Sequence, residues 1–239
     1  MNDSDRYIQQ FDESFFNDGY NLCDAFLFNG FTSENLFAAQ RRLYMVIDEL
    51  IATFLVRATR EETPSECKMG CSYCCQQTVL ASPYELFFLA DFVKKKFRDD
   101  ALQTIIQRAE DKKMATSVLN LSRLLKYKQP CPFLHPTGGY CRVYQARPMA
   151  CRIYLSKSVK SCEMDLKNPE DDTIFPALFD MPLRAGRMLN EGFHARLRKG
   201  MEDKIQAFEN TIEEGFLKAI EKGAFEKWKE GEKVFRKIN

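Results

Sequence analysis

The sequence has almost no excess charge of either sign. Its 35 lysines and arginines are matched by 34 aspartates and glutamates, which gives a formal net charge of +1. A protein that binds nucleic acid or an anionic membrane surface through general electrostatic attraction needs a marked excess of basic residues. The composition therefore predicts no nucleic-acid partner and no membrane partner.

The sequence also lacks a long apolar run. The longest candidate, residues 43–56, is interrupted by Asp48 and Glu49, whereas a membrane-spanning helix needs about 20 consecutive apolar residues. Residues 1–6 have neither the basic start nor the apolar stretch of a secretory signal. We therefore predict no membrane span and a cytoplasmic location.

Familiar catalytic patterns are missing as well. The chain has two histidines, and neither stands in a recognisable serine–histidine–acid set. We find no glycine loop of the kind that cradles phosphate and no defensible pair of carboxylates. We interpret His135 as a solvated loop residue and His194 as a surface residue of a charged helix. The sequence thus identifies no catalytic residue.

What the sequence has in excess is cysteine. Eight of its nine cysteines lie within residues 67–162, and Cys23 lies outside, where we expect a buried thiol. In a reducing cytosol, thiols at this density bind metal or carry out redox chemistry far more often than they form disulfides. An odd number of cysteines also fits poorly with a closed disulfide framework.

The eight cysteines form two groups, one compact and one spaced. The compact group falls within residues 67–75, and the spaced group follows at intervals of ten, ten and eleven residues from Cys131. A short irregular loop can bring several thiolates together at little cost in closure entropy, as a metal ion or cluster requires. Since neighbouring side chains diverge, Cys74 and Cys75 suggest either two ligand sets meeting there or one ligand beside a free thiol.

The spacing leaves the metal open. A zinc ribbon presents two Cys-x-x-Cys knuckles, and here only Cys71 and Cys74 have that spacing. Three close thiolates with a distant one, and Pro132 directly after Cys131, look more like iron–sulfur ligation, although ferredoxin spacing is not matched. We narrowly favour an iron–sulfur cluster, of the 4Fe-4S type, with Zn²⁺ as the alternative. Because the cysteine loops have few long apolar runs, we expect the metal to be required for folding.

Two arginines flank the last part of the spaced group. Arg147 and Arg152 lie on either side of Cys151. A thiolate site carries net negative charge, which such residues can neutralise or stabilise by donating hydrogen bonds to sulfur. We therefore predict that Arg147 and Arg152 contribute to cofactor binding, with Arg142, Lys68 and Lys160 as further candidates.

The apolar pattern predicts a mainly α protein. Residues 1–66 contain a helix from about 33 to 60, residues 67–162 form the cysteine-cluster region, and residues 163–239 form a helical cover. Within the middle zone, Ser82, Pro83 and Glu85 form a capping box that begins one helix, and apolar positions 102–125 indicate a second, ended by Gln129-Pro130.

In the last zone we expect a helix start at residues 168–170 and a helical stripe over 205–220. Short β-compatible pieces occur at 78–80 and 143–144, without the strand–helix alternation that a parallel sheet needs. We predict one domain over residues 1–239: a helical bundle with an irregular, cysteine-rich metal-binding centre.

The combined motifs resemble the YkgJ-like cysteine-cluster family, which is described as zinc- or iron-chelating and includes a relative in flagellin lysine N-methylase. The resemblance covers about residues 65–165 and rests on these elements in order: Cys67…Cys71…Cys74-Cys75, Ser82-Pro83-x-Glu85, Cys131-Pro132-Phe133-Leu134, Gly139-x-Cys141-Arg142-Val143-Tyr144 and Ala146-Arg147-Pro148-x-x-Cys151-Arg152. One difference is that the family opens with Cys-x-x-Cys, whereas three residues separate Cys67 from Cys71. Position by position, the resemblance implies these metal ligands: Cys67, Cys71, Cys74, Cys75, Cys131, Cys141, Cys151 and Cys162.

The same extra residue creates a second resemblance. The spacing Cys67-x-x-x-Cys71-x-x-Cys74 is similar to that of radical S-adenosylmethionine enzymes, in which three thiolates hold a four-iron cluster that chelates the cofactor. Those enzymes place the motif after the first strand of a β/α barrel, and this chain lacks the required alternation. S-adenosylmethionine thus enters as a candidate cofactor, although the fold pattern argues against membership.

These inferences lead to two expectations about function. The first is a thiolate metal-binding protein that depends on an iron–sulfur cluster and performs redox or protein-modification chemistry of a methylation type, with a protein as substrate. The second is a non-enzymatic zinc- or iron-binding module for metal storage, delivery or protein interaction. The sequence leaves open whether the chain is an enzyme.

Overall fold

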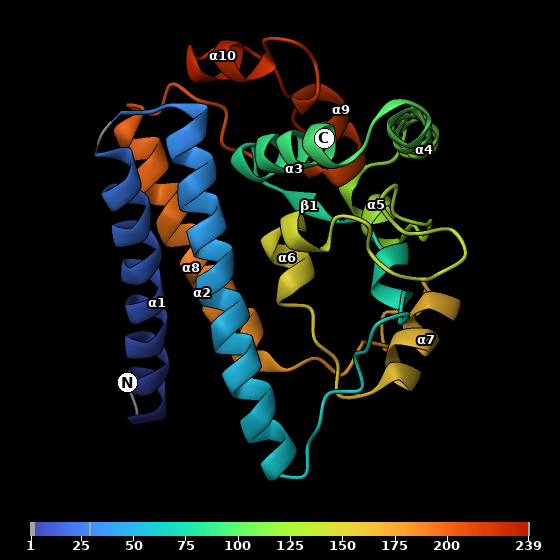
Figure 1. Ribbon diagram of the computed structural model, residues 1–239. Coiled ribbons are helices and arrows are strands. Elements are labelled where there is room, and N and C mark those ends of the chain that lie inside the picture. The colour runs from blue at the N-terminus through green and yellow to red at the C-terminus, as the bar shows by residue number, and fades with distance from the viewer. Residues whose placement is uncertain (1–2, 29, 239) are drawn as a thin grey trace.

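The computed structural model describes residues 3–28 and 30–238, and the described chain is mainly α, with 62% of its residues in helices, as predicted (Figure 1). The α-helices are α1 (Asp3–Leu27), α2 (Ser33–Arg60), α3 (Pro83–Lys96), α4 (Asp99–Thr116), α5 (Leu121–Lys126), α6 (Met149–Arg152), α7 (Val159–Lys167), α8 (Asp180–Gly200), α9 (Ile212–Ala219) and α10 (Ala224–Lys229). Two 3₁₀ helices, η1 (Tyr73–Gln76) and η2 (Tyr144–Ala146), and two short strands, β1 (Leu80–Ala81) and β2 (Asn210–Thr211), complete the fold.

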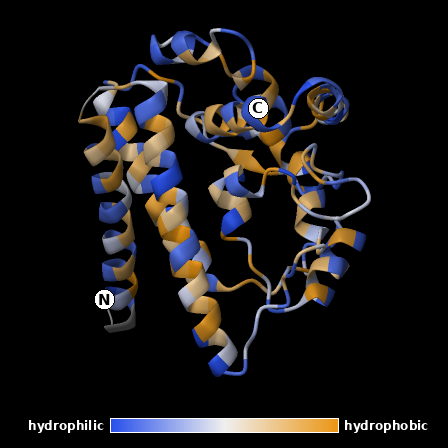
Figure 2. Ribbon diagram, in the orientation of Figure 1, coloured by the Kyte–Doolittle hydropathy of each residue, from blue (hydrophilic) through white to orange (hydrophobic). Residues whose placement is uncertain are grey.

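Three long helices, α1, α2 and α8, lie together on one side of the molecule (Figure 1). Helices α1 and α8 approach so closely that a Cβ atom on Gly19 would overlap the carbonyl of Leu189, and one on Gly192 would overlap the carbonyl of Phe16. Hydrophobic and hydrophilic residues alternate along these helices (Figure 2), as expected for helices that bury one stripe. We call α1, α2 and α8 the three-helix layer.

The boundaries of α2 agree with the sequence prediction. The helix begins at Ser33, where the Thr32 hydroxyl accepts a hydrogen bond from the Asn35 amide at 3.1 Å. This side chain satisfies one of the free amides of the first turn. The helix ends at Arg60, so the predicted span of 33 to 60 is confirmed.

Helix α3 begins at Pro83, as its capping motif predicts, and its Glu85 does more than cap. One Glu85 oxygen accepts from the Ser82 amide at 3.0 Å. The other accepts from the Met149 amide at 2.7 Å and from the Tyr44 hydroxyl at 3.0 Å. Glu85 is 2% exposed, so this buried carboxyl joins α2, α3 and α6 at the point where α6 carries a cysteine.

Two predicted helices in the middle and at the end of the chain are wrong. Positions 102–125 do not form one helix, because the chain breaks after Thr116 and the Asn120 side chain caps a new helix, α5, by accepting from the Arg123 amide at 3.0 Å. Residues 168–170 begin no helix; Asn168 instead ends α7, and the next helix starts at Asp180. In the first place, capping by Asn120 outweighs the apolar pattern. In the second, the Asn168 side chain donates to the Met164 carbonyl at 2.8 Å and ends α7 where a helix start was predicted.

The expected helical stripe at 205–220 is also only partly helical. Residues 210–211 form β2, which pairs antiparallel with β1 through Leu80 opposite Thr211 and Ala81 opposite Asn210. Only 212–219 are in α9, with Thr211 as the cap. The β-compatible pair 143–144 lies at the start of η2 rather than in a strand.

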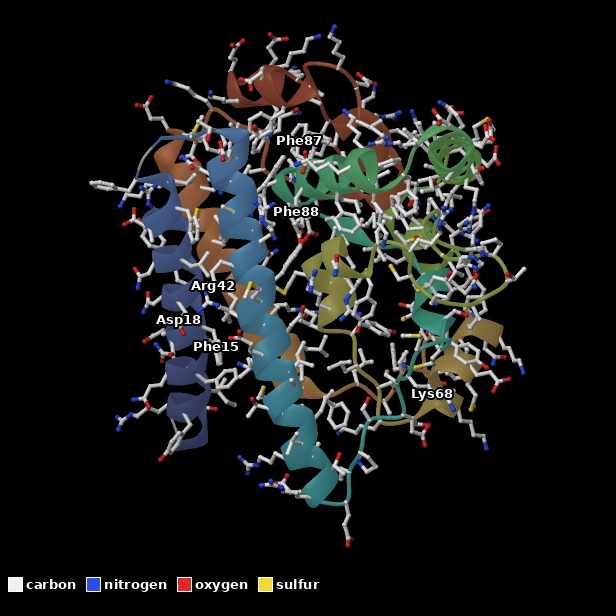
Figure 3. The ribbon with its side chains drawn as sticks, in the orientation of Figure 1. Phe15, Asp18, Arg42, Lys68, Phe87 and Phe88 are labelled. Atoms are coloured by element: carbon white, nitrogen blue, oxygen red, sulfur yellow. The ribbon has the colours of Figure 1, made fainter. Side chains whose placement is uncertain are left out.

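One contiguous hydrophobic core joins all three zones of the chain. It includes Leu43 of α2, Phe193 of α8 and Phe133 of the cysteine zone, whose ring lies 5.0 Å from that of Phe216 in α9. On α3, Phe87 and Phe88 extend this core (Figure 3), and the Phe87 ring lies 5.2 Å from that of Trp228 in α10. Among the described helices, none is long and apolar enough to cross a bilayer.

Candidate metal centre

The compact cysteine group lies on a tight loop followed by a 3₁₀ turn. The Cys71 amide donates to the Lys68 carbonyl at 3.0 Å, and Gly70 has a φ of 89°, which suits glycine far better than other residues. Helix η1 then brings the Cys75 amide to 3.0 Å from the Ser72 carbonyl. Figure 3 labels Lys68 on this loop, at the opposite side of the molecule from α1.

Backbone hydrogen bonds join this loop to the spaced group. The Cys131 amide donates to the Cys75 carbonyl at 2.7 Å, and the Gln129 amide donates to the Gln76 carbonyl at 2.8 Å. These two bonds align the start of the spaced group beside the end of the compact group. Cysteines 56 positions apart in sequence (131 minus 75) are thereby neighbours in space.

A small hairpin carries the next cysteine. Leu134 pairs with Cys141, and the Arg142 amide donates to the Phe133 carbonyl at 2.9 Å. At the tip, a Cβ atom on Gly139 would lie 2.9 Å from the carbonyl oxygen of Gly70, so the hairpin touches the first cysteine loop. The hairpin thus places Cys141 near the compact group.

The cysteines fall into two electrostatically linked groups that share Cys74. Cys74 is the common member because its charge influences the pKa of thiols in both. The inner group consists of Cys74, Cys75, Cys131, Cys141 and Cys151. The outer group consists of Cys67, Cys71, Cys74 and Cys162.

The side chains of Cys74 and Cys75 do not diverge as expected. The two thiols interact with each other in the 3₁₀ turn, and this interaction lowers the pKa of Cys74 and raises that of Cys75. Both residues belong to the inner group. Of the two, Cys74 faces the outer group as well.

The outer group is held by the start of α7. The Ser156 amide donates to the Cys67 sulfur at 3.2 Å, and Glu66 accepts from the Val159 amide at 2.5 Å at the first residue of α7. Cys162 lies on the second turn of this helix and is buried. Charge assistance from Glu66 therefore fixes the helix that brings Cys162 to Cys67.

Burial keeps most of these thiols protonated. It raises the pKa of Cys131 to about 12, and it also raises the pKa values of Cys141 and Cys151 above the usual thiol value. All nine cysteines are free. A metal ion that binds here must therefore displace protons from buried thiols, which makes binding dependent on pH.

The two predicted arginines lie in different environments. Arg147 lies over the Tyr144 ring at 3.9 Å, and its charge lowers the pKa values of three inner thiols against the effect of burial. Its Nε is buried and has no hydrogen-bond partner among the described residues. Arg147 is thus a half-buried cation close to the sulfur atoms, and its buried Nε donor is unused.

Arg152 points to α2 instead. It lies over the Tyr44 ring at 3.8 Å, forms an ion pair with Asp48 and donates to the carbonyls of Arg147 and Gln145. These residues border a surface groove of about 350 Å³ between α2 and α3. Arg152 anchors α6 to the three-helix layer, and its hydrogen bonds are all used away from the thiols.

Both histidines have local roles. His135 stacks on Tyr140 at 4.6 Å, and its Nδ1 accepts from the Gly138 amide at 3.0 Å in the hairpin. His194 is half-buried against Tyr84, and burial lowers its pKa, so its assignment as a surface residue is wrong. Cys23 is fully buried in the core, as expected.

The cysteine sulfur atoms are suitable ligands for a metal ion, but in their present positions the side chains do not enclose a metal site. Within residues 3–28 and 30–238, no three histidine, cysteine, aspartate or glutamate side chains are grouped tightly enough to hold a metal ion. Eight free thiols in two linked groups, with an unpaired donor on Arg147, nevertheless match the chemistry of an anionic sulfur site. Binding requires the thiols to turn from these positions onto a common point.

Sequence reasoning missed three charged residues of the site. Arg108 and Lys112 of α4 donate hydrogen bonds to the backbone around Cys131, and Glu213 of α9 is buried near them. Their four-residue spacing places Arg108 and Lys112 on one face of α4, which was the available signal. Nothing in the sequence marks Glu213, because it lies in a zone without cysteines.

The chain was compared with protein families, curated proteins and solved structures. No curated protein and no solved structure matches it. Residues 66–171 match the family model CxxCxxCC, described as "Putative zinc- or iron-chelating domain". The matched segment contains all eight clustered cysteines. This match confirms the resemblance inferred from the motifs over residues 66–171.

Proposed function

We propose that the chain binds an iron–sulfur cluster of the 4Fe-4S type through its clustered thiolates and uses it in redox or protein-modification chemistry. The observation that carries this proposal is the arrangement of eight free thiols in two linked groups that share Cys74. Iron–sulfur clusters are held by cysteine thiolates, and electron transfer is the chemistry that they supply. A protein substrate, a cytoplasmic location and a single domain belong to the same proposal.

The inner group would provide the principal ligands. Cys131, Cys141 and Cys151 are held by the hairpin and α6, and Cys74 joins them from η1. Arg147 lies beside three of these sulfur atoms, where its positive charge would offset part of the negative charge of the thiolates. Its unused Nε donor is available for a hydrogen bond to sulfur.

The outer group would provide a second set. Cys67, Cys71 and Cys162 are less enclosed as a group, since Cys67 is exposed and Cys71 is half-buried. The Ser156 amide donates a hydrogen bond to the Cys67 sulfur at 3.2 Å. The exposed Cys67 is where a cofactor such as S-adenosylmethionine or a substrate could reach the centre.

The test is metal and acid-labile sulfide analysis of protein purified without oxygen. The proposal predicts a coloured protein with iron and sulfide in stoichiometric amounts. Colourless protein with stoichiometric zinc and no sulfide would contradict it. Such a result would favour the second candidate below.

The second candidate is a non-enzymatic zinc- or iron-binding module, for storage, delivery or protein interaction. Burial of Cys162 supports it, because structural metal sites are closed. A change in the spectrum of the bound metal on addition of S-adenosylmethionine or a small thiol would favour the first candidate, the enzyme. Reversible loss of metal to a chelator with unchanged helical content would favour storage or delivery.

A further inference from the structure

Side chains of helix α4 donate hydrogen bonds to the backbone of the loop that carries Cys131. The Arg108 guanidinium donates to the Leu134 carbonyl at 2.6 Å and to the Cys131 carbonyl at 3.0 Å. One turn later, the Lys112 ammonium donates to the Gln129 carbonyl at 3.0 Å. Two cations of one helix face thus hold three carbonyls of the segment 129–134.

Lys112 is an unusual residue for this purpose. It is 1% exposed, and an ammonium group has three donors and a full positive charge. A hydroxyl or amide could hold a carbonyl at far lower desolvation cost, because a buried charge is expensive unless it is compensated. The charge of Lys112 therefore requires an explanation beyond the hydrogen bond to Gln129.

Two negatively charged or ionisable groups flank Lys112. Glu213 of α9 is fully buried, and neither of its carboxylate oxygens has a hydrogen-bond partner among the described residues. Burial raises the pKa of Glu213, and the charge of Lys112 opposes that shift. On the other side, Lys112 lies beside the segment that carries Cys131, because its ammonium donates to the Gln129 carbonyl two residues before that cysteine. Lys112 thus acts on both groups.

The charge balance of the site changes when metal binds. Four thiolates around a divalent ion carry a net charge of about −2, and in a medium of low dielectric constant a nearby cation stabilises that charge strongly. A nearby carboxylate destabilises it by the same rule. Lys112 and Glu213 should therefore act on metal affinity with opposite signs.

We propose that Lys112 is a positioning residue that compensates the negative charge of thiolate-bound metal at the inner group, and that Glu213 opposes it, so that this pair sets the metal affinity. The inference rests on the proposed function. It also extends the site beyond the matched family segment, because α9 lies outside residues 66–171. The C-terminal zone is then part of the metal centre as well as a cover.

The opposite signs supply the test. In the full chain under reducing conditions, Zn²⁺ affinity is measured by competition with a chromophoric chelator. Lys112→Met should lower the affinity roughly tenfold or more, and Glu213→Gln should raise it severalfold. A purely structural role would make both substitutions weaken binding or leave it unchanged.

Neighbouring residues supply matched controls. Lys113 and Glu214 follow directly on the same helices and are partly exposed, so Lys113→Met and Glu214→Gln should leave Zn²⁺ affinity within about twofold of wild type. If Lys112→Met alone fails to fold, the double variant Lys112→Met/Glu213→Gln removes both buried charges and should bind Zn²⁺ more weakly than Glu213→Gln.

The outcomes separate this inference from the proposed function. Wild-type uptake of Zn²⁺ with unchanged or lower affinity in Glu213→Gln would overturn the role of the pair and leave metal binding standing. A double variant that binds as tightly as Glu213→Gln would also overturn it. A wild-type chain that takes up no Zn²⁺ would overturn the role of the pair, whereas the proposed function is contradicted only by its own iron and sulfide analysis.

Discussion

The three-helix layer and the cysteine zone are built in different ways. In the layer, helices of 21 to 28 residues pack along their lengths, with glycines where α1 and α8 nearly touch. In the zone from 67 to 162, segments such as η1 and α6 have four residues each and are held by single backbone and side-chain hydrogen bonds. The layer is held by packing along long helices, while the cysteine loops of the zone are held by few local contacts.

The difference is one of degree, because the zone also contributes to the core. Phe133, Val143 and Ile153 are buried with residues of the long helices. Metal therefore need not create the whole fold of the zone. We expect it to fix the loops at 67–75 and 129–142 on a scaffold that α3, α4 and α9 already hold.

Replacement of the shared cysteine should have the largest effect. Cys74 belongs to both thiol groups, so Cys74→Ser should abolish metal binding at the inner group and weaken it at the outer group. Metal analysis of the purified variant checks this. Cys162→Ser should lose metal only from the outer group, and Cys23→Ser should keep the wild-type content. Equal metal contents in Cys74→Ser and wild type would refute a shared ligand.

A substitution in the layer should destabilise the fold without changing metal content. Gly192→Ala would place a methyl group against the Phe16 carbonyl, and we expect a loss of about 3 kcal/mol in the free energy of unfolding. Urea denaturation measures the loss. Gly200→Ala is the control, because the added methyl would meet only the flexible end of the Arg196 side chain. Similar losses in both variants would argue against the close helix contact.

Glu85 lies at the boundary of the two regions and should show an intermediate effect. Glu85→Ala leaves the Met149 amide and the Tyr44 hydroxyl without their acceptor, at a cost of about 2 kcal/mol in the free energy of unfolding. Glu85→Gln should cost less, since it retains an acceptor oxygen. Thermal or urea unfolding at neutral pH ranks the two variants.

Glu85 also predicts a pH dependence. Burial raises its pKa above the usual carboxyl value, so the folded chain binds this proton more tightly than the unfolded chain. Its contribution to stability is then fully present below the usual carboxyl pKa and is lost as the pH rises through the folded value. Across that pH range, the free energy of unfolding of the wild type should decline relative to that of Glu85→Gln. Parallel profiles would contradict this assignment.

The smallest effect concerns the two arginines. Arg147→Gln removes a positive charge beside three inner thiols and should lower Zn²⁺ affinity by roughly tenfold, with little change in metal-free stability. Arg152→Gln breaks the ion pair with Asp48 and should lower stability with little change in affinity. Chelator competition and urea unfolding on both variants separate these outcomes. The reverse pattern would show that the assignments are exchanged.

Of the three layer helices, the sequence predicts bounds for α2 alone. Of the centre, it predicts the cysteines but not their arrangement. The apolar pattern locates α2 correctly and the capping box locates α3 correctly, because both signals are local to the helix. The break between α4 and α5, and the strand at 210–211, depend on Asn120 and on pairing with β1. Where local structures compete in this way, tertiary packing decides which one forms.

The candidate site shows the same limit. Family motifs name the eight cysteines, because their spacing is local. They do not show that Arg147 faces the thiols while Arg152 faces α2, because Arg147 lies between η2 and α6, whereas Arg152 ends α6 and pairs with Asp48 of α2. Lys112 and Glu213 meet near Cys131 only through the packing of α4 on α9. Charges brought together by tertiary packing have no signature along the chain.

X-ray absorption spectroscopy at the edge of the bound metal tests the central claim most directly. It reports the atoms bound to the metal in anaerobically prepared protein. Thiolate binding by the clustered cysteines predicts sulfur neighbours at about 2.3 Å, with iron neighbours in addition if the metal is a cluster. A spectrum that contains only nitrogen and oxygen neighbours would contradict the account.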